Sequence, residues 1–224
     1  MASHRSTRWL ALAASLGVVV LLAACTSAPT GSIGVTPSPG SASVAPDGTA
    51  VAAATVILQA TRLGDPDTIA ALEGIRLTPA GTAAAGAILK AGASGDALWA
   101  ATFVYASGSG DPALLRPLAV DATASPSVRA MAAAGLVGGG DIAGFDPLIA
   151  ALAGSDDMDG AEPAGKVWEF ASDVLERYTH RGVGPALTAS DAERTAIQGQ
   201  WQQWFTTNKA LLHFDAAARL WAAS

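Results

Sequence analysis

The chain has 224 residues, half of them hydrophobic, and a formal net charge of −6. An acidic chain lacks the basic surface that binds phosphates, which argues against a nucleic-acid partner. Lys and Arg are not clustered, which also argues against electrostatic binding to anionic lipid. Because Cys25 is the single cysteine, the chain forms no internal disulfide, and its stability must come from packing.

Residues 1–24 have the anatomy of an export signal, with Arg5 and Arg8 before an uncharged apolar run over residues 9–24. The run is shorter than the roughly 20 apolar residues that span a bilayer, so a retained transmembrane helix is the weaker alternative. The two arginines are not adjacent, which favours general secretion over the twin-arginine route.

The end of this signal carries a specific motif. The sequence Leu22-Ala23-Ala24-Cys25 resembles the lipobox of bacterial prolipoproteins at all four positions. The resemblance implies that the Cys25 thiol receives a diacylglyceryl group, with fatty acids such as palmitate, and that the signal is cut just before it. The mature protein would then be lipid-anchored on the extracytoplasmic face of the cell membrane. The alternative is that Cys25 is an ordinary signal residue and cleavage follows Ala28.

Residues 25–50 form the predicted lipidated N-terminus and linker. Most of them are Ser, Thr, Pro or Gly, and Asp47 is the one charged residue. Such a segment buries too little apolar surface to order itself, so we expect a flexible tether spanning about 25–30 Å on average. The alternative is a wall-binding or glycosylated stalk.

Beyond residue 50 a capping residue is repeatedly followed by proline. Asp, Ser or Thr accepts hydrogen bonds from the free N–H groups of a first helical turn, and proline at the next position has no N–H to leave unpaired. Each pair therefore predicts a helix start, and no alternating strand pattern competes. The pairs are Asp65-Pro66, Thr78-Pro79, Asp111-Pro112, Ser125-Pro126 and Asp146-Pro147.

Apolar residues at three- and four-residue steps agree with these starts and predict three amphipathic helices. A capping box, Ser190 with Glu193, precedes the last of them. The stripes are Leu98, Ala101, Thr102 and Tyr105; Val167, Phe170, Ala171, Val174, Leu175 and Tyr178; and Ile197, Trp201, Trp204 and Phe205.

The helix pairs recur at an offset of about thirty residues, the signature of a helical solenoid. One unit opens with Val128-Arg129-Ala130 and continues through a Gly-rich turn to Asp146-Pro147. This unit resembles the short bacterial HEAT-like repeats, and the C-terminal sequence resembles the segment that closes such arrays. The resemblance implies an all-α fold, an α/α superhelix, with HEAT-like repeats over residues 51–183 and a C-terminal helical cap over residues 184–224.

Three residues are candidates for partner binding, because Trp and Arg dominate binding hot spots. They are Trp99, Arg129 and Trp168, and both tryptophans stand where the repeat family usually has other residues. The favoured alternative for the two tryptophans is a place in the core.

The sequence offers no catalytic, cofactor or metal motif, and the two histidines beyond the signal, His180 and His213, lie in no ligand spacing. Residues 138–140, all glycine, are read as a helix-ending turn rather than a phosphate site. The acidic run over residues 155–162 resembles a calcium loop, but Ser155 and Lys166 occupy ligand positions that need carboxylates. We therefore expect a solvated loop between repeats.

Taken together, the sequence favours a lipid-anchored scaffold that binds a protein or peptide partner and catalyses no reaction. Stacked helix pairs present a long curved surface suited to such a partner. Two alternatives remain: an envelope hydrolase using acidic residues of the run 156–162, and a purely structural spacer in a cell-envelope assembly.

Overall fold

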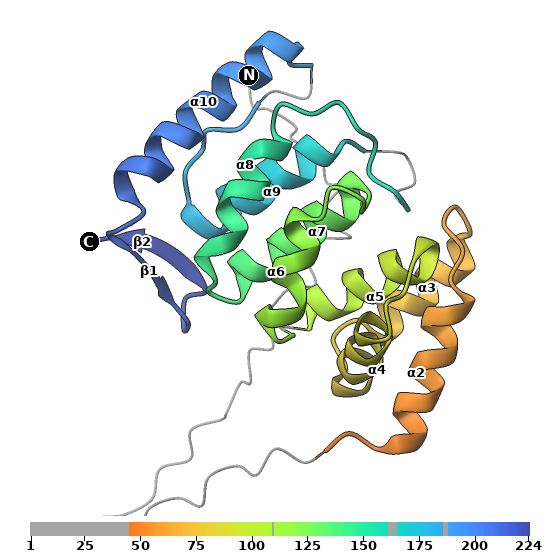
Figure 1. The fold of residues 1–224 in the computed structure, drawn as a ribbon. Helices are drawn as coiled ribbons and strands as arrows, with labels where there is room; N and C mark the ends of the chain where they lie inside the picture. The colour runs from red at the N-terminus through yellow and green to blue at the C-terminus, as the bar shows by residue number, and fades with distance from the viewer. Residues whose placement is uncertain (1–44, 109, 161–164, 186–187) are drawn as a thin grey trace, which may run out of the picture. The chain divides into compact units, whose positions relative to one another are not determined.

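Packed helix pairs make up most of the computed structural model, which describes residues 45–108, 110–160, 165–185 and 188–224 (Figure 1). The predicted signal, Cys25 and most of the tether lie outside the described residues. The helices are α2 (Gly48–Ala60), α3 (Pro66–Ile75), α4 (Pro79–Lys90), α5 (Gly95–Ser107), α6 (Pro112–Val120), α7 (Pro126–Gly138), η1 (Ile142–Gly144), α8 (Phe145–Ala151), α9 (Val167–Thr179) and α10 (Asp191–Asn208). A hairpin of β1 (Leu212–Asp215) and β2 (Leu220–Ala223) follows.

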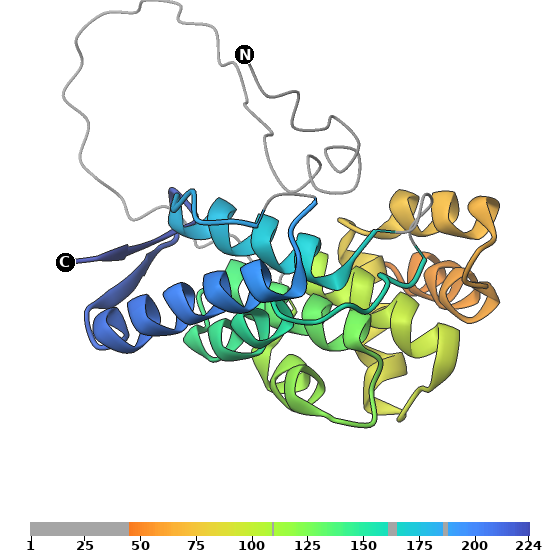
Figure 2. The same cartoon turned by 90° about the horizontal axis from the view of Figure 1, so that it is seen from above.

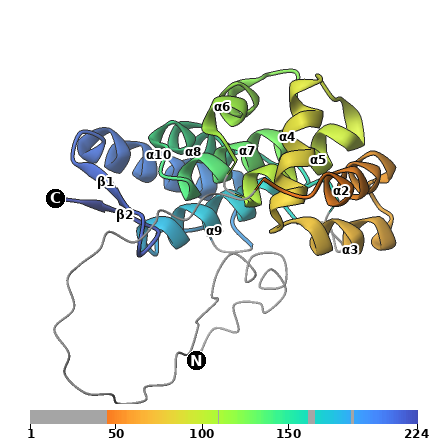
Figure 3. The same ribbon diagram turned by 90° about the horizontal axis from the view of Figure 1, so that it is seen from below.

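The helices follow one another in space much as they do along the chain. Figures 2 and 3 show α2 and α3 at one end of this body, and α10 with the hairpin at the other. Helix α4 packs against α5, α6 against α7, and α5 against α7, so α5 and α7 lie at the centre. Seven consecutive residues of α5, positions 99–105, are buried. Among the described residues, no helix is long and apolar enough to cross a bilayer.

Four of the five predicted cap and proline pairs are confirmed as helix starts. The capping side chains are Asp65 for α3, Thr78 for α4, Asp111 for α6 and Ser125 for α7, and each accepts a hydrogen bond from an N–H of its first turn. The capping box of Ser190 and Glu193 at the start of α10 is confirmed as well. Local backbone chemistry therefore sets most of the helix boundaries.

The prediction for Asp146 was wrong. Asp141 is the capping residue, because its Oδ1 accepts from the N–H of Ala143 at 3.0 Å and opens the short helix η1. Helix η1 continues directly into α8, which begins at Phe145. Pro147 still lies in the first turn of α8, where its missing N–H costs no hydrogen bond.

The small residues that dominate the composition allow the central helices to approach closely. A Cβ added at Gly135 of α7 would lie 2.7 Å from the Cβ of Ala106 at the end of α5, and one at Gly86 of α4 would lie 2.8 Å from the Tyr105 ring. Distances below about 3 Å are shorter than normal van der Waals contacts, so these positions need glycine.

The predicted stripe of α9 is buried apart from half-buried Phe170. On α10, Trp201 and Phe205 are buried, while Ile197 and Trp204 are half-buried. Helical periodicity therefore identified the packed faces of α9 and α10. It was wrong for α5, where residues 99–105 are all buried and Leu98 of the predicted stripe is half-buried, because this central helix is covered on all sides.

The C-terminal hairpin departs from the all-α expectation. Strands β1 and β2 pair antiparallel, with Phe214 opposite Trp221, and Asp215 accepts the N–H groups of Ala217 and Ala218 in the turn. The predicted helical cap is therefore one helix, α10, followed by this hairpin. A strand of four residues is too short for alternation to distinguish it from helix in the sequence.

Candidate functional site

The hairpin closes the C-terminal end of α7. Trp221 Nε1 donates to the carbonyl oxygen of Val137 at 2.9 Å, and Arg219 Nη2 donates to that of Gly138 at 3.2 Å. The last carbonyl groups of a helix have no partner within it and carry partial negative charge, so an indole N–H and a guanidinium are suitable donors.

An aromatic cluster holds the hairpin against the helices. The Phe145 ring is fully buried, with centroid distances of 5.0 Å to Phe205 and 5.3 Å to Trp221. Phe214 extends the cluster at 5.4 Å from Trp221. Because these rings come from α8, α10 and both strands, the hairpin is fixed to the body by side-chain packing.

The glycine run over residues 138–140, at the end of α7, is confirmed as a helix-ending turn. The N–H groups of Gly139 and Gly140 donate to carbonyl groups of α7, and Gly140 has a φ of +84°. A Cβ at Gly140 would lie 2.6 Å from the Phe214 ring, so glycine serves both the backbone conformation and the contact with the hairpin. Because these amides are already bonded, they are not available for a phosphate.

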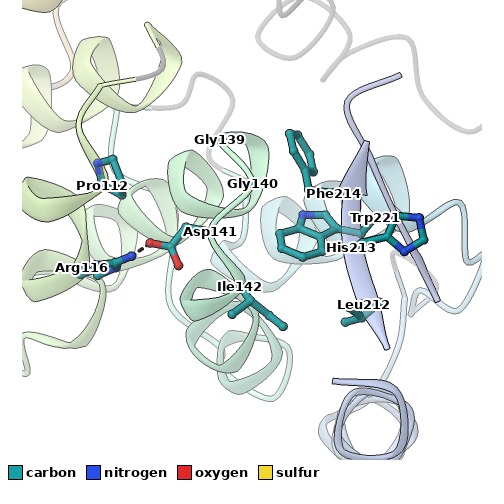
Figure 4. A pocket seen from close by; sticks show the side chains of 10 residues that line it. All are labelled: Pro112, Arg116, Gly139, Gly140, Asp141, Ile142, Leu212, His213, Phe214 and Trp221. Carbon is teal, nitrogen blue, oxygen red and sulfur yellow. Dashed lines mark hydrogen bonds and ion pairs between the residues drawn. The ribbon is translucent and has the colours of Figure 1, made fainter. Parts of the chain in front are cut away.

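A surface pocket of about 460 Å³ lies between this turn and the hairpin (Figure 4). In Figure 4 the rings of Phe214 and Trp221 lie on the side of the hairpin that faces Gly140, and the His213 ring lies on the opposite side. Other apolar residues that line the pocket are Pro112, Ile142 and Leu212. Its lining residues are Pro112, Arg116, Gly139, Gly140, Asp141, Ile142, Leu212, His213, Phe214 and Trp221.

One ion pair borders the pocket. Arg116 Nε lies 2.6 Å from Asp141 Oδ2, while Asp141 Oδ1 already accepts from the N–H of Ala143. The Asp141 side chain is 11% exposed and that of Arg116 is 58% exposed. Among the residues that the structure describes, neither Nη of Arg116 has a hydrogen-bond partner. The pair therefore exposes the Arg116 guanidinium at the pocket and covers the Asp141 carboxylate.

A second surface pocket, of about 640 Å³, lies along α4. Tyr105 is one of its lining residues, and its hydroxyl accepts from the N–H of Asp111 at 2.8 Å. Burial raises the pKa of Tyr105 above the ordinary tyrosine value. Small side chains and the half-exposed Leu77 line the rest, with Lys90 among the lining residues. This pocket offers few groups that would fix the orientation of a ligand.

Two of the three predicted binding residues are buried. Trp99 and Trp168 are each 4% exposed, Trp99 stacked on Phe103 and Trp168 beneath the guanidinium of Arg194. Neither indole is exposed, and the burial of both agrees with a place in the core. Arg129 on α7 is half-buried, and it is the one of the three with substantial solvent contact.

The described part of the acidic run, residues 155–160, is solvated at its start and docked at Met158. Residues 155–157 are exposed, and Lys166 Nζ lies 2.6 Å from Asp157 Oδ1. Met158 is buried, and Asp159 Oδ2 accepts from the Ser125 hydroxyl at 2.8 Å. The expectation of a solvated loop therefore fits residues 155–157 and misses the contacts of Met158 and Asp159. In the described part of the chain, no group of three or more His, Cys, Asp or Glu is placed to hold a metal ion.

Comparison with known proteins identifies no relative. No family model, curated protein or solved structure matches the chain. The chain's own geometry is therefore the basis for any function.

Sequence reasoning missed the pocket at the hairpin. Arg116, Asp141 and Trp221 are far apart in the sequence, and only packing of the hairpin on α7 brings them together. The one local signal is the alternation of Leu212 and Phe214 with the polar His213 and Asp215, which is too short to identify a strand by itself.

Proposed function

We propose that the chain is a membrane-anchored, extracytoplasmic lipoprotein whose HEAT-like helical repeats act as a non-catalytic scaffold for a protein or peptide partner. The observation that carries the binding proposal is the pocket between the hairpin and the end of α7. It combines an aromatic and aliphatic floor with an exposed, anchored guanidinium at Arg116. Aromatic rings and arginine are the groups that contribute most to protein interfaces.

The chemistry of the pocket supports contact rather than catalysis. Both Asp141 oxygens are occupied by hydrogen-bond donors, and the His213 ring lies on the other side of the hairpin. A general acid or base has to reach the reacting group, and neither side chain is placed to do so. Of the acidic residues named in the hydrolase alternative, Asp157 and Asp159 are engaged by Lys166 and Ser125.

The membrane anchor rests on the resemblance of Leu22-Ala23-Ala24-Cys25 to a lipobox. Mass spectrometry of the mature N-terminus tests it, and we expect a diacylated Cys25 as the first residue. A Cys25→Ser variant should lose the lipid and leave the membrane fraction. An unmodified cysteine in the membrane-bound wild-type protein would contradict the anchor without affecting the binding proposal.

Chemical cross-linking of the full chain in cells tests the scaffold. We expect one reproducible partner, and its yield should fall with Arg116→Ala or Arg129→Ala while circular dichroism and the melting temperature stay unchanged. Asp67→Ala is a matched control, because Asp67 is exposed on α3 and lines neither pocket. Turnover of a small substrate with no partner captured would overturn the proposal.

A further inference from the structure

Among the described residues, the sheet consists of β1 and β2, so each strand has an outer edge without a partner strand. Strand β2 lies near α9, and β1 supplies most of the hairpin residues that line the pocket. The N–H of Ser224 donates to the carbonyl oxygen of Leu211 at 3.4 Å, which makes this a hydrogen-bonded pair. Because such pairs alternate along an antiparallel ladder, the N–H and C=O groups of Leu212 and Phe214 point away from β2. In the described part of the chain, neither N–H donates outside the hairpin.

The β1 edge borders the pocket. Leu212 and Phe214 line it and are half-buried, whereas His213, which also lines it, and Asp215 are exposed. Side chains of neighbouring strands that share a face stand beside one another. A third strand added along β1 would therefore direct every second side chain toward the pocket.

The charge at the pocket indicates which side chains would fit. Arg116 is held through Nε, so both of its Nη groups remain available for a carboxylate, and the neighbouring Asp141 carboxylate is largely covered. An arginine anchored in this way is suited to a second, charge-assisted interaction with an acidic group. The rest of the floor, formed by Ile142, Leu212 and Trp221, accommodates an apolar side chain.

We propose that the β1 edge and this pocket bind an extended segment of a partner protein as a third strand. The segment carries an Asp or Glu and an apolar side chain two residues apart, so that both lie on the face toward the pocket. The carboxylate pairs with Arg116, and the backbone pairs with Leu212 and Phe214. This inference rests on the proposed scaffold function and specifies its partner.

A pair of peptides of identical composition tests the spacing. The probe is fluorescein-labelled Ser-Thr-Glu-Thr-Val-Thr-Val-Thr-Ser, and its control exchanges Glu with the Thr before it. That shift moves the carboxylate to the opposite face of an extended peptide. In fluorescence anisotropy with the full chain in detergent, we expect the probe to bind at least about tenfold more tightly than the control. Equal affinities, or binding of neither peptide, would overturn the proposal.

Two further measurements locate the site. Arg116→Gln should weaken probe binding about tenfold, the usual scale for a charge-assisted hydrogen bond. Arg62→Gln should leave the affinity unchanged, because Arg62 is exposed in the turn after α2 and lines neither pocket. Saturating probe should also slow hydrogen exchange of the Leu212 and Phe214 amides, and those of Ala87 and Lys90 should not change. Binding without this protection would contradict strand addition.

The scaffold function and the proposed strand addition can fail separately. If cross-linking in cells captures a partner that depends on Arg129 but not on Arg116, and the probe does not bind, the scaffold remains and the strand proposal is wrong. If neither a partner nor probe binding is found, both are wrong.

Discussion

Trp221 donates the hydrogen bond that completes the last turn of α7, at 2.9 Å from its Nε1 to the carbonyl oxygen of Val137, across 84 positions of sequence. Both groups are buried. The same carbonyl also accepts from the N–H of Gly140 at 3.2 Å, so the indole is its second donor, and it couples the end of the chain to the central helix.

Trp221→Phe should therefore destabilise the protein. The phenyl ring is smaller than the indole, and the carbonyl of Val137 loses one of its two donors but keeps the N–H of Gly140, so losing this hydrogen bond costs about 0.5–1.5 kcal/mol of unfolding free energy. Urea denaturation followed by circular dichroism measures the change. Trp204→Phe is the control, because no hydrogen bond joins the half-buried Trp204 indole N–H to the described residues. Equal effects of the two substitutions would contradict the role given to the bond.

Two Gly→Ala substitutions should change the free energy of unfolding in opposite directions. At Gly135 the added Cβ would lie 2.7 Å from Ala106 Cβ and 2.9 Å from its Cα, and such overpacking costs about 1–3 kcal/mol. At Gly199 of α10 nothing lies within 4 Å, so the higher helix propensity of alanine should stabilise the protein by up to about 1 kcal/mol. Melting temperatures that shift in the same direction would contradict the close packing of α5 and α7.

Ser125→Ala should cost about 1 kcal/mol, the usual value of an N-cap, and should loosen the acidic loop. Ser125 accepts from the N–H of Val128 and donates to Asp159, so it caps α7 and holds the loop together. Ser94→Ala is the matched control, since Ser94 stands at the N-cap of α5 without a side-chain capping bond. Hydrogen exchange of the loop amides should rise in the Ser125 variant alone.

The capping box of α10 predicts a pH effect. The N–H and hydroxyl of Ser190 both donate to Glu193, and these bonds lower the pKa of that carboxyl below its ordinary value. A lowered folded-state pKa means that the stabilisation is present above the unfolded value and is lost as the pH falls through the folded one. Ser190→Ala removes the hydroxyl donor and keeps the N–H, so it should raise the pKa of Glu193 only part of the way toward its ordinary value in an NMR titration. An unchanged pKa would contradict the capping role.

The sequence predicted those parts of the fold that depend on local chemistry. Asp65, Thr78, Asp111 and Ser125 cap helices because each needs only the backbone of its own first turn. The helix start predicted at Asp146 was wrong because a short helix opened by Asp141 continues into α8 without a break.

Other features depend on contacts between distant parts of the chain. Whether Trp99 is exposed or buried depends on Phe103 beside it and on Gly160, some sixty positions away. The hairpin and its pocket depend on the aromatic cluster around Phe145, which forms only when α8, α10 and the strands meet. Periodicity within one segment contains no information on such contacts.

We propose that this protein holds a partner at the hairpin end of its helical body. A photoactivatable amino acid at position 112, beside the pocket, tests it most directly, with position 203 on the exposed face of α10 as the reference site. We expect that illumination of living cells joins a single partner protein to position 112 and none to position 203. The same products at both positions, or none at either, would contradict it.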